Sequence, residues 1–188
     1  MPPEEVIADG RLRKGAQRRQ SLLDATLRLI GRGGLAAVTQ RAVAAEAGLP
    51  PSAVMYYFPT IRDLIVATLA SLNDRYTTDL EALPGGVKGV EALAALLTTY
   101  SGQDRESLLA ENELWLLAAR DRTLAAEAAR WDQALTDTAA RLTSDPVAAD
   151  DLVIAYIGLY VRAVTAGSLE LRAVEAVLRR FAGHSRGI

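Results

Sequence analysis

The segment GLPPSAVMYYFPT, residues 48–60, concentrates hydrogen-bonding side chains in a short stretch bounded by prolines. Ser52 and Tyr56 stand four residues apart, so a helix would place both hydroxyls on one face, and Tyr57 would fall beside Ala53. Hydroxyls presented in this way can reach phosphate oxygens or base edges of DNA. The stretch therefore favours a helix that reads nucleic acid, with half-buried packing as the alternative for the two tyrosines.

Other kinds of chemistry have little support in the sequence. There is no cysteine, and the one histidine, His184, stands close to the end of the chain, which disfavours thiolate chemistry, a histidine base and a histidine-rich metal site. No apolar run approaches the ~18 residues typical of a membrane span, and the N-terminus lacks the apolar core of a secretory signal. We therefore expect a cytoplasmic protein that is not an enzyme, with no catalytic residue, metal, cofactor or membrane partner.

Charge is distributed unevenly along the chain. Residues 10–62 carry nine Lys and Arg against Asp24 and Glu46, a net charge of +7, whereas residues 63–188 carry 12 basic and 18 acidic residues. A basic N-terminal third favours contact between that part and a polyanion, with a solvated basic face as the alternative.

Helix-forming residues dominate and strand signals are nearly absent, so we predict an all-α chain. Thr39 is suited to cap a helix, Gly48 to end it in the left-handed conformation, and Pro51 to begin the next one. Two short helices joined by such a corner form the helix-turn-helix pattern. The predicted helices, about nine in all, cover residues 15–31, 40–47, 51–58, 61–78, 90–100, 105–120, a segment capped by Asp121 or Thr123 that reaches about 143, 146–166 and 171–182.

The second helix of a helix-turn-helix lies in the major groove and presents its N-terminal residues to base edges. The N-terminus of the preceding helix suits a phosphate, and the basic segment RLRKGAQRR can add phosphate or minor-groove contacts. Val54 and Phe58 are predicted to pack on the first helix instead. The residues predicted to contact DNA on these grounds are Arg18, Thr39, Gln40, Arg41, Pro51, Ser52, Ala53, Tyr56 and Tyr57.

The segment VTQRAVAAEAGLPPSAVMYYFPTIRDLI, residues 38–65, resembles the N-terminal region of TetR-like transcriptional repressors. Their pattern is roughly Thr, three residues, Ile-Ala, two residues, Ala-Gly-Val-Ser, a few variable residues, Leu-Tyr-x-His-Phe and a capped helix. The resemblance covers about residues 15–65. The matching residues, in identity or in type, are Thr39, Val43, Ala44, Ala47, Gly48, Leu49, Val54, Phe58, Pro59, Thr60 and Leu64.

Several positions depart from that pattern. Pro50 replaces the usual Ser, Met55 stands where a DNA-contacting tyrosine is usual, Tyr57 replaces a histidine, and Ile61 replaces a lysine for which Arg62 could substitute. The resemblance thus adds Met55 and Arg62 to the predicted DNA contacts. We expect fewer hydrogen-bonded base contacts than usual, with more weight on shape, methyl contacts and the basic arm.

The resemblance also implies a second helical domain that binds a small molecule and dimerises. The predicted organisation is a flexible basic arm over 1–14, a helix-turn-helix DNA-binding domain over 15–62, and a helical ligand-binding and dimerisation domain over 63–188.

Within LLAENELWLLAARD, one helical face is predicted to carry Leu108, Asn112, Trp115, Leu116 and Ala119. This face would point the Asn112 amide inward, where it needs a core partner or a ligand.

Aromatic and hydroxyl side chains could line a mostly apolar ligand pocket, with ordinary core packing as the alternative for each. Glu111 and Glu113 are interpreted as surface charges and are excluded from this set. The predicted ligand-binding residues are Tyr100, Asn112, Trp115, Trp131, Thr138, Tyr156 and Tyr160.

The segment VAADDLVIAYIGLYVRAVTAG, residues 147–167, is apolar nearly all round after its first turn. Ala155, Gly158 and Ala163 would allow another helix to approach closely, so we predict that this helix and the last one form a four-helix dimer interface. Two-fold symmetry would then set the reading helices about 34–36 Å apart, in successive major grooves.

The sequence as a whole predicts a dimeric repressor that binds a palindromic DNA operator and is released by a small, largely apolar effector. The first alternative is a helical small-molecule carrier or enzyme that uses the first three helices as scaffold. The second is a non-specific architectural DNA binder, whose C-terminal core would be occluded.

Overall fold

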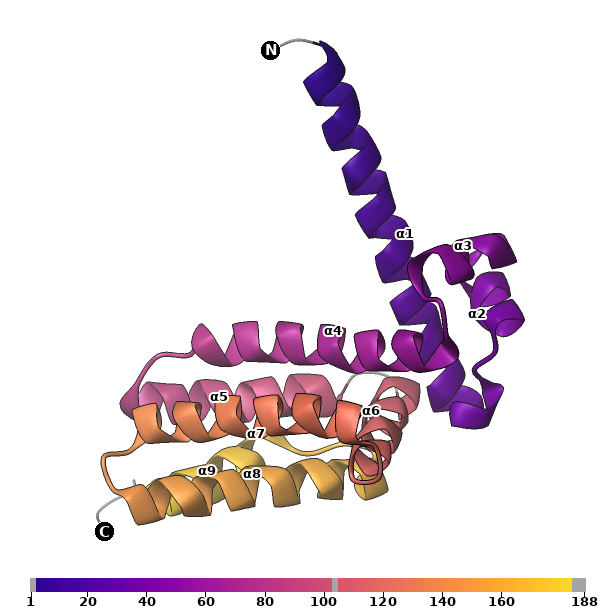
Figure 1. Ribbon diagram of the computed structural model, residues 1–188. Helices are drawn as coiled ribbons and strands as arrows, with labels where there is room; N and C mark the ends of the chain where they lie inside the picture. The colour runs from indigo at the N-terminus through magenta and orange to yellow at the C-terminus, as the bar shows by residue number, and fades with distance from the viewer. Residues whose placement is uncertain (1–2, 103–104, 184–188) are drawn as a thin grey trace.

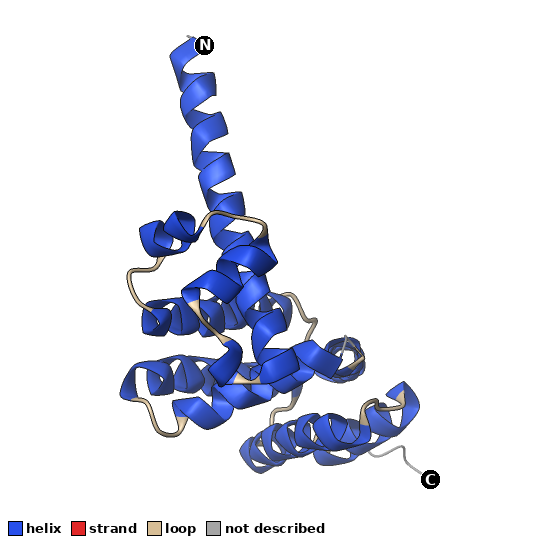
Figure 2. Ribbon diagram, turned by 90° about the vertical axis from the view of Figure 1, so that its right-hand side faces the viewer, coloured by secondary structure: helices blue, strands red, loops and turns tan. Residues whose placement is uncertain are grey.

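The computed structural model describes residues 3–102 and 105–183 of the chain, so His184 lies outside the described residues. Within those ranges the chain is all-α, as predicted, and Figure 2 shows helices and loops only. None of the described helices is long and apolar enough to cross a membrane. The elements are α1 (Pro3–Gly33), the 3-10 turn η1 (Leu35–Ala37), α2 (Gln40–Ala47), α3 (Pro51–Tyr57), α4 (Ile61–Glu81), α5 (Gly86–Ser101), α6 (Arg105–Ala118), α7 (Arg122–Leu142), α8 (Pro146–Ala166) and α9 (Leu171–Phe181).

The helices form a small head and a larger bundle (Figure 1). Helices α2 and α3 pack beside α1, whose N-terminal half projects beyond them. Residues 3–14, predicted as a flexible arm, form the first turns of α1, which begins at Pro3 instead of near Gly15. The sequence has no proline between residues 4 and 15 that would break the helix.

Local capping explains the helix-turn-helix. The Thr39 hydroxyl accepts a hydrogen bond from the Ala42 N–H, 3.1 Å away, and begins α2 as predicted. Gly48 ends α2 with φ 65° and ψ 30°, the left-handed conformation that a glycine adopts without a Cβ penalty. Helix α3 ends at Tyr57, one residue earlier than predicted, because Phe58 precedes a proline and is extended, with φ −138° and ψ 99°.

The longer helices are also capped by side chains. Thr60 and Asp63 form a reciprocal capping box at the start of α4. Asp121 accepts from the N–H groups of Thr123 and Leu124 at the start of α7, and Asp145 accepts from the Val147 N–H at the start of α8. These caps confirm the predicted starts of α4, α7 and α8. Helix α5 begins at Gly86, one turn before the predicted start at residue 90.

Two buried clusters hold the fold together. One joins the head to the bundle: Leu22, Val43 and Val54 of the head are buried in the same cluster as Leu114 of α6 and Leu124 of α7. The other lies among α4, α5, α7, α8 and α9. The head therefore shares its hydrophobic core with part of the bundle.

Helices α1 and α6 approach each other closely at Gly31. A Cβ atom added to Gly31 would lie 2.1 Å from the carbonyl oxygen of Glu106, a backbone atom that cannot move without shifting α6. The only side chain that this crossing accepts without displacement is therefore a hydrogen atom.

Two alanine substitutions within α1 test this packing. Gly31→Ala should lower the free energy of unfolding by about 1–3 kcal/mol, because the added methyl group overpacks the crossing. Gly15→Ala should raise it by about 0.5–1 kcal/mol, because alanine is the better helix former and its Cβ would meet the Tyr57 hydroxyl only at 3.7 Å. Urea unfolding of both variants measures the difference, and a stabilising Gly31→Ala would contradict the close approach.

Candidate nucleic-acid interface and aromatic cavity

The outer face of α3 is open to solvent. Pro51 and Ser52 are exposed at its N-terminus, and the Tyr56 and Met55 side chains are 81% and 57% exposed. Val54 and Phe58 are buried against the head, as predicted. This face therefore has the small N-terminal residues and the outward hydroxyl that contact with a DNA groove requires.

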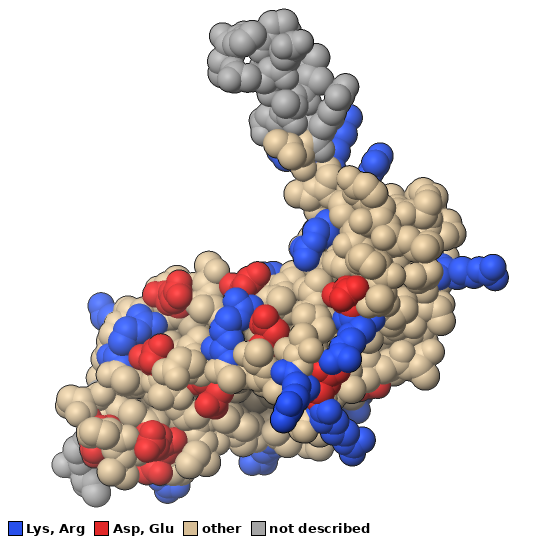
Figure 3. Space-filling view, viewed as in Figure 1, with Lys and Arg blue, Asp and Glu red and all other residues tan. Residues whose placement is uncertain are grey.

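A broad groove of about 900 Å³ lies between α1 and α3. Basic side chains stand along the projecting part of α1 and the head in Figure 3, whereas the helices below carry both signs of charge. The groove is lined by Leu12, Lys14, Gly15, Ala16, Arg18, Arg19, Pro50, Ser52, Ala53, Tyr56 and Tyr57. It combines positive charge with the exposed face of α3.

Some basic residues of the head are engaged within the protein. Glu46 pairs with Arg28 at 2.7 Å and Arg32 at 2.5 Å, and these hydrogen bonds lower the pKa of the Glu46 carboxyl. In the part of the chain that the structure describes, Arg18 and Arg41 form no ion pair and are exposed. Gln40 follows Thr39, the N-cap of α2, and is partly exposed.

Tyr57 is half-buried and packs on the core of the head. Its ring makes an edge contact with Tyr56, with the centroids 5.0 Å apart, and its hydroxyl lies close to Gly15 of α1. Tyr57 therefore links α3 to α1, while its predicted DNA contact stays a prediction.

Arg62, in the first turn of α4, joins α4 to α7. Its Nη2 atom donates to Asp121 Oδ1 at 2.8 Å and to Thr123 Oγ1 at 3.1 Å. Hydrogen bonds from the Thr123 and Leu124 N–H groups and the charge of Arg62 lower the pKa of the Asp121 carboxyl. The predicted contact of Arg62 with DNA phosphate would require it to leave this pair.

A closed cavity of about 30 Å³ lies between α4, α5, α6, α7 and α8. Aromatic rings surround it: the Tyr76 ring stacks on Trp131 with centroids 5.6 Å apart, and Trp115 meets Trp131 edge-on at 4.8 Å. This volume holds about one or two water molecules, so a larger ligand needs the rings to separate. Its lining residues are Leu69, Leu72, Asn73, Tyr76, Tyr100, Glu111, Trp115, Trp131 and Tyr160.

Glu111 contributes a carboxyl group to this aromatic lining. The Tyr160 hydroxyl donates a hydrogen bond of 2.6 Å to Glu111 Oε2. Burial raises the pKa of the Glu111 carboxyl, and the Tyr160 hydrogen bond and the charge of Arg75 oppose this rise only in part. Burial also raises the pKa of Tyr160, which is therefore a hydrogen-bond donor at neutral pH.

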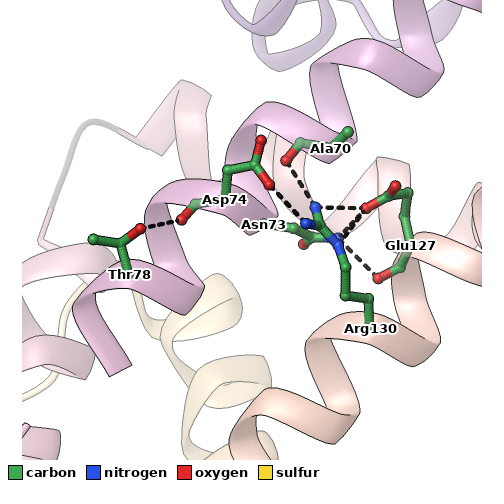
Figure 4. Close-up of polar contacts among 6 residues, drawn as sticks. All are labelled: Ala70, Asn73, Asp74, Thr78, Glu127 and Arg130. Carbon is green, nitrogen blue, oxygen red and sulfur yellow. Dashed lines mark hydrogen bonds and ion pairs between the residues drawn. The ribbon is translucent and has the colours of Figure 1, made fainter. Parts of the chain in front are cut away.

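Polar contacts fix the α4 wall of the cavity to α7 (Figure 4). The Asn73 amide donates to the Glu127 carbonyl at 2.8 Å and to its carboxylate at 3.0 Å. Arg130 bonds the same carboxylate and reaches back to Asp74 at 2.6 Å and to the Ala70 carbonyl at 3.1 Å. Asn73 thus connects the cavity to a network on the surface between α4 and α7.

An open groove of about 520 Å³ lies on the other side of the cavity wall. Trp115, Trp131 and Tyr160 line both the closed cavity and the open groove. Asn112, Leu116, Ala128, Ala129, Asp132, Ile157 and Val161 complete the groove. Three rings therefore separate the cavity from a surface opening.

The predicted ligand-binding residues fall into two sets. Tyr100 lines the closed cavity, Asn112 lines the groove, and Trp115, Trp131 and Tyr160 line both. Their part in binding stays a prediction.

Thr138 and Tyr156 line neither space, which corrects their predicted positions. The Thr138 hydroxyl donates to the Ala134 carbonyl within α7 at 2.8 Å. The Tyr156 side chain is fully buried, and its hydroxyl is bonded to that of Tyr76, on the wall of the cavity. Their hydroxyl groups serve packing within and between helices.

The predicted inward face of α6 is correct for Leu108, which is buried, and for Trp115, which lines the cavity, but wrong for Leu116 and Ala119. Leu116 is 72% exposed and Ala119 is exposed, whereas Leu114 and Ala118 are buried. The Asn112 amide donates to the Leu108 carbonyl of its own helix at 2.9 Å, so it needs no ligand to be satisfied. The true face is rotated because α6 packs against α1 on the side of Leu114.

Glu111 and Glu113, interpreted as surface charges, both have specific positions. Glu111 stands three residues after Leu108 and four before Trp115, a spacing that places it on the same side of a helix as these residues. That spacing was the available signal for its inward position. Glu113 Oε1 accepts a hydrogen bond of 2.7 Å from the Leu35 N–H in the head, a long-range contact that no local pattern indicates.

A helix-turn-helix head joined to a bundle that encloses an aromatic cavity defines the class of helix-turn-helix regulatory proteins. The family model described as bacterial regulatory proteins, tetR family, matches residues 22–68. A second model, described as the tetracyclin repressor-like C-terminal domain, matches residues 87–184. The chain belongs to the tetR family of bacterial regulatory proteins.

Individual proteins are also similar to this chain in sequence or in structure. The chain is 30% identical over 150 residues to the transcriptional repressor KstR of Mycolicibacterium smegmatis, covering 78% of this chain and 74% of KstR. It is 36% identical over 81 residues to the transcriptional regulator BetI of Rhizobium meliloti, covering 43% of this chain but only 40% of BetI. The chain is also similar to the solved structure of the multidrug binding protein EbrR complexed with malachite green, with 33% sequence identity and a TM-score of 0.71. The match covers 88% of this chain and 98% of the EbrR chain.

The raised pKa of Glu111 predicts a pH-dependent stability. The folded state holds the Glu111 proton more tightly than the unfolded state, so the protein loses stability as the pH rises from below 4.5, the ordinary pKa, through the raised value. Glu111→Gln keeps an acceptor for Tyr160 and removes this loss. The variant should therefore gain stability relative to the native protein as the pH rises to neutrality, as measured by urea unfolding between pH 4 and 8.

Tyr160→Phe provides the matched comparison. It removes the donor that lowers the pKa of Glu111, so its stability should fall more steeply with pH than that of the native protein. Parallel pH curves for the native protein and Glu111→Gln would contradict the buried position of the carboxyl.

Proposed function

We propose that this protein is a ligand-responsive, dimeric repressor that binds a palindromic operator and is released from it by a small molecule. The observation that carries the proposal is the pairing of an exposed, basic helix-turn-helix head with an aromatic cavity through one helix, α6. The repressor KstR and the multidrug binding protein EbrR, the latter solved with malachite green, support the two halves of this proposal. Cytoplasmic location is part of the proposal.

In the proposed complex, α3 lies in the major groove. Pro51, Ser52 and Ala53 face base edges, and Tyr56 and Met55 stand one turn further along. The N-terminus of α2, with Thr39, Gln40 and Arg41, meets a phosphate, and Arg18 of α1 meets the flanking backbone.

Helix α6 would carry the signal from the cavity to the head. On one side it presents Glu111 and Trp115 to the cavity. On the other it contacts the head, where Glu106 meets Gly31 and where Glu113 accepts from the Leu35 N–H. A ligand that separates the rings would displace α6 and with it the head.

Helix α4 would respond at the same time. Its Asn73 and Tyr76 line the cavity, and its first turn holds Arg62, which is paired with Asp121 of α7. Tilting α4 would change the separation of the two reading helices in a dimer. The ligand shifts this equilibrium only if it binds one arrangement more tightly than the other. The preferred arrangement must be one with a larger cavity, because the cavity of about 30 Å³ is too small for the ligand.

The proposed dimer uses α8 and α9. Val147 and Ile154 are each 68% exposed, and their spacing places them with Gly158 on one face of α8. A Cβ on Gly158 would meet no atom within 4 Å in this chain. This apolar, close-approach face suits a second copy of the chain.

Arg41→Ala tests the DNA interface. Loss of a phosphate contact should weaken binding to DNA from the protein's own promoter and reduce the salt slope of binding by about 1 per bound protomer. Fluorescence anisotropy between about 50 and 200 mM salt measures both. Lys88→Ala serves as the control, because it removes an equal charge from an exposed residue of α5, and it should bind like the native protein. Unchanged binding by Arg41→Ala would place the interface elsewhere.

Gly158→Leu tests the dimer. The larger side chain has space in one chain and suits a helix better than glycine, yet it should prevent another helix from approaching α8. Sedimentation equilibrium should give the mass of one chain for this variant and of two for the native protein. Thr99→Leu, at an exposed residue of α5, is the control and should leave the mass unchanged. A dimeric Gly158→Leu variant would rule out this face of α8 as the dimer interface.

A further inference from the structure

The closed cavity contains one charged side chain among its lining residues as the structure describes them: Glu111. The remaining lining is leucine, one asparagine and five aromatic rings. The sequence predicts a largely apolar effector. If that effector were also neutral, it would give this carboxyl no charge partner, and nothing in the ligand would offset the cost of burying it. Leucine or glutamine at residue 111 would serve such a ligand at lower cost.

We propose that the effector is an aromatic organic cation, with Glu111 as its counter-ion and the rings of Tyr76, Tyr100, Trp115 and Trp131 as its walls. The inference deepens the proposed function, on which it rests, by giving the chemical class of its ligand. A cationic nitrogen within about 6 Å of a ring face is attracted by the quadrupole of that ring, and most strongly by tryptophan. A carboxylate in the same narrow, largely apolar space adds a direct charge attraction.

The geometry supplies both elements at one place. Tyr76 is the central ring: it stacks on Trp131 at 5.6 Å and meets Tyr100 edge-on at 5.3 Å. Glu111 faces the same space, with Oε2 held by the Tyr160 hydroxyl at 2.6 Å. Tyr160 is a neutral donor, so it orients the carboxyl without neutralising its charge. A cation can therefore pair with Glu111 while Tyr160 stays bonded.

A ligand can enter the cavity after one rearrangement, because the open groove lies directly behind the cavity wall. The wall between the groove and the cavity consists of Trp115, Trp131 and Tyr160. Rotation of the two indole rings away from each other would join about 520 Å³ of groove to the cavity. That combined space is within the usual range for a drug-sized ligand.

Tryptophan fluorescence reports on this wall alone, because the chain has two tryptophans and both belong to it. The full-length protein is titrated with benzyltrimethylammonium and with neopentylbenzene, which has the same shape and no charge. The cation should change the fluorescence and bind at least tenfold more tightly than its neutral counterpart. Equal affinity for the two probes would overturn the inference without any substitution in the protein.

Substitution then locates the charge. Glu111→Gln should weaken binding of benzyltrimethylammonium at least tenfold and bring it close to that of neopentylbenzene. Glu81→Gln is the matched control, since it removes the same charge from an exposed position at the end of α4 and should keep the preference for the cation. Native affinity in Glu111→Gln, with its fold verified by circular dichroism, would overturn the inference.

Binding of the native protein to promoter DNA, measured without ligand, separates the two proposals. Sequence-preferring DNA binding without cation preference would overturn the ligand class and leave the repressor. Cation preference without DNA binding would support the ligand class and overturn the repressor.

Discussion

The crossing of α1 and α6 is the contact on which the rest of the arrangement depends. At Gly31 the two backbones meet so closely that a Cβ would lie 2.1 Å from the Glu106 carbonyl oxygen. Four residues after Gly31, the Leu35 N–H at the base of the head donates to Glu113 of α6. Because Trp115 and the cavity lie on the same helix, the position of the head is fixed relative to the cavity by backbone and not by adjustable side chains alone.

Beside this rigid crossing, the ion pairs between α4 and α7 within the bundle are polar and partly exposed. The Arg62 side chain is 62% exposed in its pair with Asp121, and Arg130 reaches Asp74 near the surface. Exposed pairs of this kind stabilise a fold only weakly, far less than the buried cluster that spans head and bundle. The fold thus combines a firm joint at α1 and α6 with joints along α4 that a modest binding energy can rearrange.

The sequence predicted the head far better than the cavity, and the reason is physical. The signals at Thr39, Gly48, Pro51 and Thr60 act within a few residues, so capping and turn rules find the corner and both helix starts. Helix α6 offered no comparable signal. Its leucines occupy several faces, so periodicity alone did not determine which side is buried.

Packing against distant parts of the chain determines which side of α6 is buried, which periodicity alone did not. The approach of α1 rotated α6, exposed Leu116 and turned Glu111 into the cavity. The positions of Thr138 and Tyr156 depended on the same kind of information: both are buried, yet their hydroxyls bond other groups. A pattern can indicate that a polar side chain is buried, but it does not identify the partner: Tyr156 bonds Tyr76 of α4, whereas Thr138 bonds a carbonyl of its own helix.

The three residues between α3 and α4 give the head mechanical stiffness. Phe58 is anchored in the core, the ring of Pro59 fixes one backbone torsion, and Thr60 is tied reciprocally to Asp63. With so few free torsions, this hinge cannot absorb a rotation of α4 and must deliver it to α3. Helix α4 has 21 residues. At about 1.5 Å per residue it is a lever of roughly 30 Å, on which a tilt of about 5° moves the end by about 3 Å. A small angular change at the cavity is thereby amplified into a displacement as large as a hydrogen bond is long.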